Sequence, residues 1–206
     1  PLVSLMVTFT TFAIGYLARP LGGLVLGRLG DKFGRRGVFL ASIFVTSAAT
    51  LGIGIVPTYA TWGIAASIIV VLLRLTQGFC LGGELPGAIT YVVESAPLLA
   101  PFVCSVVFGC VTLGVALGTT IALVVGNILT PVEAALYGWR IAFVVGGLLG
   151  LASFWLRRSF EESPEFAELK RLAAASKEPL SELVRTHPAQ IFVGIAAQAV
   201  TAVFAG

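Results

Sequence analysis

Three ionisable side chains lie in long apolar stretches of the sequence, where a charge is costly. Arg19 follows the uncharged run 1–18, Arg74 follows the uncharged run 37–73, and Glu84 comes ten residues later. A charged group inside a membrane span costs about 2.5–3.5 kcal/mol on insertion scales and is a functional candidate by default. A guanidinium attracts carboxylates, and a buried carboxyl group is a candidate proton site. We therefore treat all three residues as candidate functional residues.

The segment that follows Arg74 adds further polar side chains at helical spacing. Gln77, Glu84 and Tyr91 are seven residues apart and so lie along one helix face, with Arg74 close beside it. Arg74 and Glu84 would be about 15 Å apart along the axis, too far to pair directly. Each needs a partner on another helix, in water or in a ligand. One alternative stays open, in which Arg19 and Glu84 form an interhelical ion pair that only holds the bundle together.

Glycine and proline surround these residues. Pro20 follows Arg19, and Pro86 comes two residues after Glu84. Proline removes one backbone hydrogen bond from a helix, so we expect the carbonyls of Tyr16 and Gly82 to be freed next to the charged residues. Broken helices that carry charge are a recurring feature of transport sites. The glycines near Glu84 should allow another backbone to approach closely, and they are Gly78, Gly82, Gly83 and Gly87.

The composition indicates a membrane protein. The mean hydropathy is +1.00 and 11% of the residues are charged, whereas about 25% are charged in soluble domains. A helix needs roughly 20 apolar residues to cross a bilayer. We therefore expect an all-α polytopic membrane protein with five spans and part of a sixth, at 2–26, 38–57, 64–92, 102–129, 139–156 and 189–206.

Basic residues predict the orientation. The turn at 27–37 is basic and should be cytoplasmic by the positive-inside rule, which puts 130–138 outside and 157–188 inside. Helix-start signals and an apolar stripe in 157–188 predict short amphipathic helices on the cytoplasmic membrane surface; a solvated linker is the alternative. The chain would then comprise a transmembrane bundle at 1–156, a cytoplasmic loop at 157–188 and the start of a further span at 189–206.

Several classes of function and site are disfavoured. The net charge of +3 arises in short loops, so we do not expect nucleic acid binding. His187 is the only histidine, and the three cysteines lie in apolar segments, so we expect neither a metal site nor a cofactor. The sequence has no HExxH or GxSxG motif, which argues against an enzyme. It starts and ends inside apolar runs, and we expect it to be a fragment of a longer protein.

The turn and several neighbouring motifs resemble a known family. Residues 27–36 fill every fixed position of G-x-L-x-D-[RK]-x-G-[RK]-[RK], the signature between helices two and three of major facilitator superfamily transporters. Residues 74–78 resemble the fourth-helix R-x-x-Q-G signature of the same superfamily. The metabolite–proton symporter family, which includes proline/betaine, shikimate, citrate and 2-oxoglutarate permeases, is similar at residues 19–23, 82–84, 138–143 and 157–164.

This resemblance implies a protein of twelve helices in two bundles that works by alternating access. The chain would be the N-terminal bundle from helix two to helix six, plus the start of helix seven. The missing C-terminal half would be its partner in the same polypeptide. The turn would form an intracellular gate with Gly27, Gly30, Asp31, Lys32, Gly34, Arg35 and Arg36. The turn at 94–101 lacks the Arg-Gly that is usual in the family, so its cytoplasmic contact is in doubt.

We therefore expect a secondary active transporter that takes up a small polar metabolite, a carboxylate by preference, together with protons. Substrate and proton coupling would involve Arg74, Gln77, Glu84, Arg19 and Tyr91. The protein would be a multi-pass protein of the bacterial inner membrane. A uniporter or exporter of the same fold is one alternative, and a membrane receptor or scaffold that does not transport is another.

Overall fold

The computed structural model describes residues 2–159 and 188–189. Within these ranges the chain forms helices joined by short connections. The long helices are α1 (Leu2–Phe33), α2 (Arg35–Ile55), α4 (Ile64–Ser95), α5 (Ala100–Ile128) and α7 (Trp139–Arg157). The short ones are α3 (Tyr59–Trp62), η1 (Pro97–Leu99), α6 (Pro131–Glu133) and the π-helical turn η2 (Ala134–Gly138).

The chain is an all-α polytopic membrane protein, as its composition predicts. Four helical segments of the described residues are long and apolar enough to cross a membrane: Arg35–Ile55, Ile64–Val93, Pro97–Ile128 and Leu136–Arg157. They match the spans expected at 38–57, 64–92, 102–129 and 139–156. The expected span at 2–26 lies within α1, which has 32 residues.

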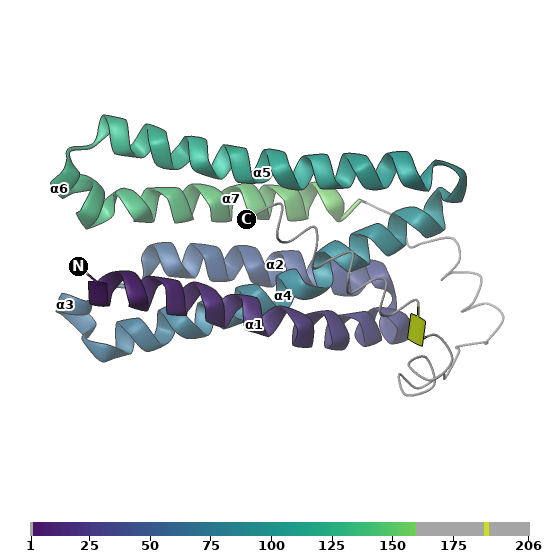
Figure 1. Cartoon of the computed structure of the whole chain (residues 1–206), viewed down its shortest axis with the longest axis horizontal. Coiled ribbons are helices and arrows are strands. Elements are labelled where there is room, and N and C mark those ends of the chain that lie inside the picture. Colours follow the sequence, from purple (N-terminus) through teal and green to yellow (C-terminus); the bar gives the residue numbers. More distant parts are fainter. Residues whose placement is uncertain (1, 160–187, 190–206) are drawn as a thin grey trace. The chain divides into compact units, whose positions relative to one another are not determined.

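Helix α2 lies at the centre of the described bundle. It packs against α1, α4 and α7, while α1 also packs along α4 (Figure 1). The side chains that α2 buries include Ile43, Ala49 and Ile53, together with Ser42 and Ser47. Both serine hydroxyls donate to carbonyls of the preceding turn, so they are satisfied without a partner on another helix. By contrast, α5 buries no residue within the described part of the chain.

Glycines bring the backbones of α1 and α4 together. A Cβ at Gly78 would clash with the backbone of Gly15, and a Cβ at Gly82 with the backbone of Arg19. A Cβ at Gly22 would in turn clash with the Phe79 carbonyl. These glycines confirm the close approach expected from the sequence. They fix the position of α1 against α4.

The basic turn differs from the prediction. Helix α1 continues to Phe33 and α2 begins at Arg35, so only Gly34 interrupts the helices between 27 and 37. Gly34 has φ 103°, a conformation that glycine adopts at little cost. Asp31 and Arg35 form an ion pair of 3.4 Å across this break, and this favours a sharp corner over a loose turn.

The two prolines of the candidate region do not interrupt their helices. Both α1 and α4 continue as helices through Pro20 and Pro86. A proline removes one hydrogen bond of the helix ladder, and the neighbouring bonds and the close α1–α4 packing keep the helix continuous. The candidate residues therefore lie on regular helices.

The connection at 130–138, which was expected to be a loop, contains α6 and η2. Thr130 caps this segment: its backbone N–H and its hydroxyl both donate to the Glu133 carboxylate, at 3.0 and 2.7 Å. Pro131 occupies the first helical position. The pattern Thr-x-x-Glu with proline after the threonine is a helix-start signal that the sequence analysis missed.

The predicted boundaries between the transmembrane bundle, the cytoplasmic loop and the further span stay predictions. The chain divides into two compact units, 1–168 and 169–206. Helix α7 ends at Arg157, one residue beyond the expected end of the bundle. The expected cytoplasmic loop at 157–188 and the expected span at 189–206 lie almost wholly outside the described residues.

The α1–α4 glycine contact can be tested by adding a single methyl group. Gly78→Ala should lower the free energy of unfolding by about 1–3 kcal/mol, because the new Cβ meets rigid backbone. Thermal unfolding of the purified protein in detergent measures the effect. Gly114→Ala on α5 is the matched control, since its Cβ meets nothing within 4 Å. Equal midpoints for the two variants would contradict the contact.

Candidate functional site

Arg74 lies in a polar cluster that joins α2, α4 and α7. Its Nη1 donates to Oε1 of Gln77 at 3.1 Å, one turn along α4. Nε2 of Gln77 donates to Oγ1 of Thr50 on α2 at 2.6 Å. The guanidinium also lies over the ring of Phe143 on α7, 4.9 Å from the ring centroid. The cation thus contacts α7 directly and is linked to α2 through Gln77.

Two members of this cluster, Arg74 and Gln77, were predicted from the sequence, whereas Thr50 and Phe143 were not. Arg74 and Gln77 were expected to be neighbours on α4, and they are bonded. Thr50 was missed because a threonine in an apolar helix commonly bonds its own backbone. Phe143 was missed because an aromatic residue in a span is ordinarily a packing residue. It lies in the Gly138–Phe143 motif that carried part of the family resemblance, which was the available signal.

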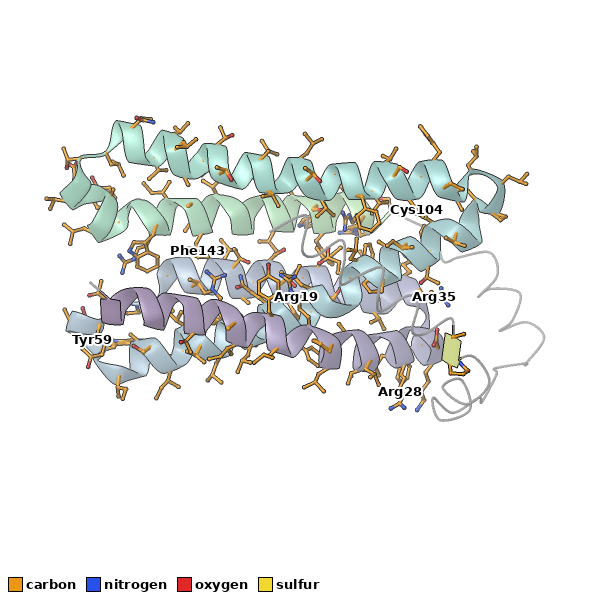
Figure 2. The ribbon with its side chains drawn as sticks, viewed as in Figure 1. Arg19, Arg28, Arg35, Tyr59, Cys104 and Phe143 are labelled. Carbon is orange, nitrogen blue, oxygen red and sulfur yellow. The ribbon has the colours of Figure 1, made fainter. Side chains whose placement is uncertain are left out.

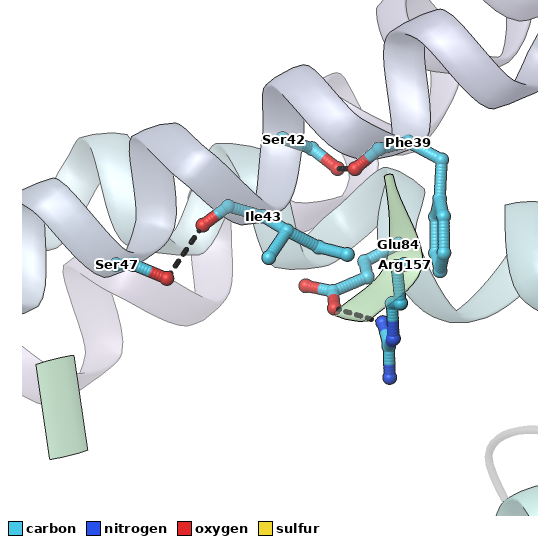
Figure 3. Close-up of polar contacts among 6 residues, drawn as sticks. All are labelled: Phe39, Ser42, Ile43, Ser47, Glu84 and Arg157. Atoms are coloured by element: carbon cyan, nitrogen blue, oxygen red, sulfur yellow. Dashed lines mark hydrogen bonds and ion pairs between the residues drawn. The ribbon is translucent and has the colours of Figure 1, made fainter. Parts of the chain in front are cut away.

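Glu84 forms an ion pair with a residue that the sequence analysis did not consider. Oε1 of Glu84 lies 3.4 Å from Nη1 of Arg157 at the end of α7 (Figure 3). The side chains are 23% and 34% exposed, so the pair is partly shielded from solvent. The Arg157 guanidinium also lies over the ring of Phe39 on α2. The end of α7 is thereby held against both α2 and α4.

The alternative pairing of Arg19 with Glu84 is wrong. The Arg19 guanidinium lies over the ring of Tyr16, 3.9 Å from the centroid and one turn earlier on α1 (Figure 2). Its Nε is buried and has no hydrogen-bond partner. Arg19 and Glu84 were expected at a similar depth in the membrane, but the partner of Glu84 is Arg157 at the end of α7.

Tyr91 is half-buried on α4, seven residues after Glu84. The predicted polar stripe of α4 is therefore divided between two centres: Arg74 and Gln77 belong to the cluster with Thr50 and Phe143, whereas Glu84 belongs to the ion pair with Arg157.

The corner between α1 and α2 borders a cavity of about 230 Å³. Gly27, Gly30, Asp31 and Arg35 of the predicted gate line it, together with residues of α4 that include Pro86. The other gate residues lie nearby: the Lys32 amine is 5.2 Å from the centroid of the Phe33 ring. Nη2 of Arg36 donates to the carbonyl of Arg158 at 2.5 Å, a second link between α2 and the end of α7.

Arg140 secures the opposite end of α2 and α7. Its Nη2 donates to the carbonyl of Val56, which ends α2, at 3.2 Å, and its Nη1 donates to the carbonyl of Leu136 at 2.7 Å. A guanidinium suits this position because it satisfies terminal carbonyls that the helices leave unpaired. Arg140 lies in the motif at 138–143 that resembles the symporter family, and this contact was not predicted from the sequence.

The described residues contain no group of three or more His, Cys, Asp or Glu that could hold a metal ion. Cys80, Cys104 and Cys110 form no disulfide. The expectation that the protein uses no metal or other cofactor stays a prediction.

The pairing of Glu84 with Arg157 can be tested by unfolding. Arg157→Gln should lower the free energy of unfolding by about 1–3 kcal/mol, because it leaves a partly buried carboxylate without its counter-charge. The double variant Glu84→Gln/Arg157→Gln should recover part of this loss in detergent. Arg158→Gln, on the next residue and exposed, is the control. Strictly additive effects of the two substitutions would exclude the pair.

Comparisons with known proteins place these features in a family. The chain is 37% identical over 191 residues to the shikimate transporter of Escherichia coli, covering 91% of this chain and 44% of that protein. It is 36% identical over 185 residues to the proline/betaine transporter of Salmonella typhimurium, covering 88% and 37%. The chain thus spans less than half the length of these relatives. Both are named as transporters of the kind that the motifs predicted.

The fold has relatives among solved structures. The partially occluded inward-open structure of the xylose transporter XylE from E. coli matches with a TM-score of 0.70 at 19% identity, covering 77% of this chain and 38% of that one. All these proteins are transporters, in agreement with the prediction that the chain is not an enzyme. The sequence model of the Major Facilitator Superfamily matches residues 2–206. The chain belongs to the major facilitator superfamily.

Proposed function

We propose that this chain is the N-terminal part of a secondary active transporter that takes up a small polar carboxylate together with protons. The observation that carries the proposal is the cluster in which α2, α4 and α7 hold the Arg74 guanidinium. The family supports transport, and the relatives named for shikimate and for proline and betaine make a small polar metabolite a reasonable cargo.

Arg74 is suited to bind a carboxylate. A guanidinium presents planar, bidentate donors that match the two oxygens of a carboxylate. Gln77 and Phe143 are neutral, so they orient the guanidinium without cancelling its charge. Arg19, with its buried and unpartnered Nε, is a second candidate on the neighbouring helix. Gln77 would act by holding Arg74, and Tyr91 stays a more distant candidate.

Glu84 is the candidate proton site. In its ionised form it attracts Arg157 across 3.4 Å. Protonation would remove the negative charge and weaken that attraction. Proton binding would therefore loosen the contact of the end of α7 with α2 and α4. The proton is then the coupling ion, and we expect no other cofactor.

The complete transporter would add a C-terminal half that faces this bundle across the substrate path. The gate would form at the corner with Gly27, Gly30, Asp31, Lys32, Gly34, Arg35 and Arg36. The protein would be an integral, multi-pass protein of a bacterial inner membrane, in keeping with its apolar helices and its bacterial relatives.

Substitution of Arg74 tests the substrate site. Arg74→Lys should raise the KM for uptake of a labelled carboxylate by about tenfold to a hundredfold, because the loss of charged, bidentate hydrogen bonds costs about 1.5–3 kcal/mol. Uptake by the full-length protein in proteoliposomes measures this. Arg28→Lys, at an exposed position in the corner, should leave the KM unchanged. An unaltered KM in Arg74→Lys would remove Arg74 from the substrate site.

Substitution of Glu84 tests the coupling. Glu84→Gln should abolish the stimulation of uptake by an inward proton gradient, because a glutamine amide cannot bind and release a proton as a carboxylate does. Glu133→Gln, which replaces an exposed carboxylate between spans, is the control and should keep the stimulation. Uptake by the wild-type protein that does not respond to a protonophore would indicate a uniporter. Net export would indicate an exporter, and binding without accumulation would indicate a receptor.

A further inference from the structure

We propose that Thr50 on α2 and Phe143 on α7 are positioning residues that fix the orientation of the Arg74 guanidinium. The inference rests on the proposed function, in which Arg74 binds the substrate carboxylate. Neither residue has an ionisable side chain. Phe143 contacts the Arg74 guanidinium from α7, and Thr50 contacts Gln77, the hydrogen-bond partner of Arg74, from α2 (Figure 2 labels Phe143).

Two hydrogen bonds link Arg74 to Thr50 through Gln77, and in each of them the donor and the acceptor are fixed. A guanidinium has only donors, so it must face the carbonyl oxygen of the Gln77 amide, at 3.1 Å. The amide nitrogen of Gln77 then points to Thr50 and donates to its hydroxyl, at 2.6 Å. The Thr50 hydroxyl has one hydrogen, and it donates that hydrogen to the carbonyl of Thr46 at 2.7 Å. Thr50 can therefore only accept from Gln77.

This directionality makes Thr50 the group that, together with Arg74 itself, fixes the orientation of the Gln77 amide. Gln77 is only 8% exposed, so water competes weakly for its amide. Without the Thr50 hydroxyl, the amide nitrogen would lose its acceptor and the amide could rotate. Its oxygen would then no longer be held toward Arg74.

Phe143 constrains the guanidinium in a different way. The cation lies over the face of the Phe143 ring, at 4.9 Å from the centroid, which is a favourable cation–π arrangement. Gln77 holds one edge of the planar group while the ring supports one face. Bidentate recognition of a carboxylate depends on the plane and the edge of the guanidinium together, so both contacts bear on substrate affinity.

The test compares Thr50 variants in the full-length protein. Thr50→Val keeps the size of the side chain and removes the hydroxyl, and it should raise the KM for a carboxylate about tenfold with little change in the maximal rate. Thr50→Ser keeps the hydroxyl and should restore a KM near that of the wild type. Thr76→Val removes an exposed hydroxyl of α4 that bonds only the carbonyl of Leu72, and it should change nothing.

Two further measurements separate this inference from the proposed function. In an Arg74→Lys background, Thr50→Val and Phe143→Leu should add no further increase in KM, because both act through the guanidinium. The thermal midpoint in detergent, measured without substrate, should show coupling between Thr50→Val and Gln77→Leu. A raised KM in Arg74→Lys with a normal KM in Thr50→Val would overturn the inference and leave the function standing. If Arg74→Lys transports normally, the proposed function fails. If Thr50→Val and Gln77→Leu then also show no thermal coupling, the proposal that Thr50 orients Gln77 fails as well.

Discussion

The cost of placing a charge inside an apolar bundle determines how α2, α4 and α7 are held together. The Arg74 guanidinium donates a hydrogen bond to the Gln77 amide and lies over the Phe143 ring. Glu84, nearer the basic corner, is met by Arg157 from the end of α7. Each contact satisfies a group that would be costly alone. The same contacts fix the relative position of three helices, so the groups proposed to work in transport also help to order the bundle.

Glycines supply the complementary constraint on α1. The backbones of α1 and α4 touch at Gly22, Gly78 and Gly82, where any side chain would separate them. This contact places Arg19 beside α4 without any ion pair to Glu84. Packing by small residues therefore positions α1, whereas polar contacts connect α2, α4 and α7. Because α1 is positioned by backbone packing and α7 by polar contacts, the partner of Glu84 is Arg157 on α7 and not Arg19 on α1.

The sequence predicted the features that depend on local patterns. Apolar runs located the spans, the glycines near Glu84 predicted the close approach of another backbone, and helical periodicity placed Arg74 beside Gln77. The basic turn is shorter than the sequence suggested, because Gly34 alone makes the corner, and both helices continue through their prolines. Thr50, Phe143 and Arg157 were missed because their roles come from contacts between segments far apart in the chain, which periodicity along one helix cannot reveal.

The central claim is that an oriented guanidinium at Arg74 recognises a negatively charged substrate group. The most direct measurement is equilibrium binding of a small carboxylate and of its uncharged amide analogue to the full-length protein, in wild type and in Arg74→Lys. The account predicts that the wild type binds the carboxylate at least about tenfold more tightly than the amide, and that Arg74→Lys loses most of this preference. Equal affinity of the wild type for the two compounds, or a preference that survives in Arg74→Lys, would contradict it.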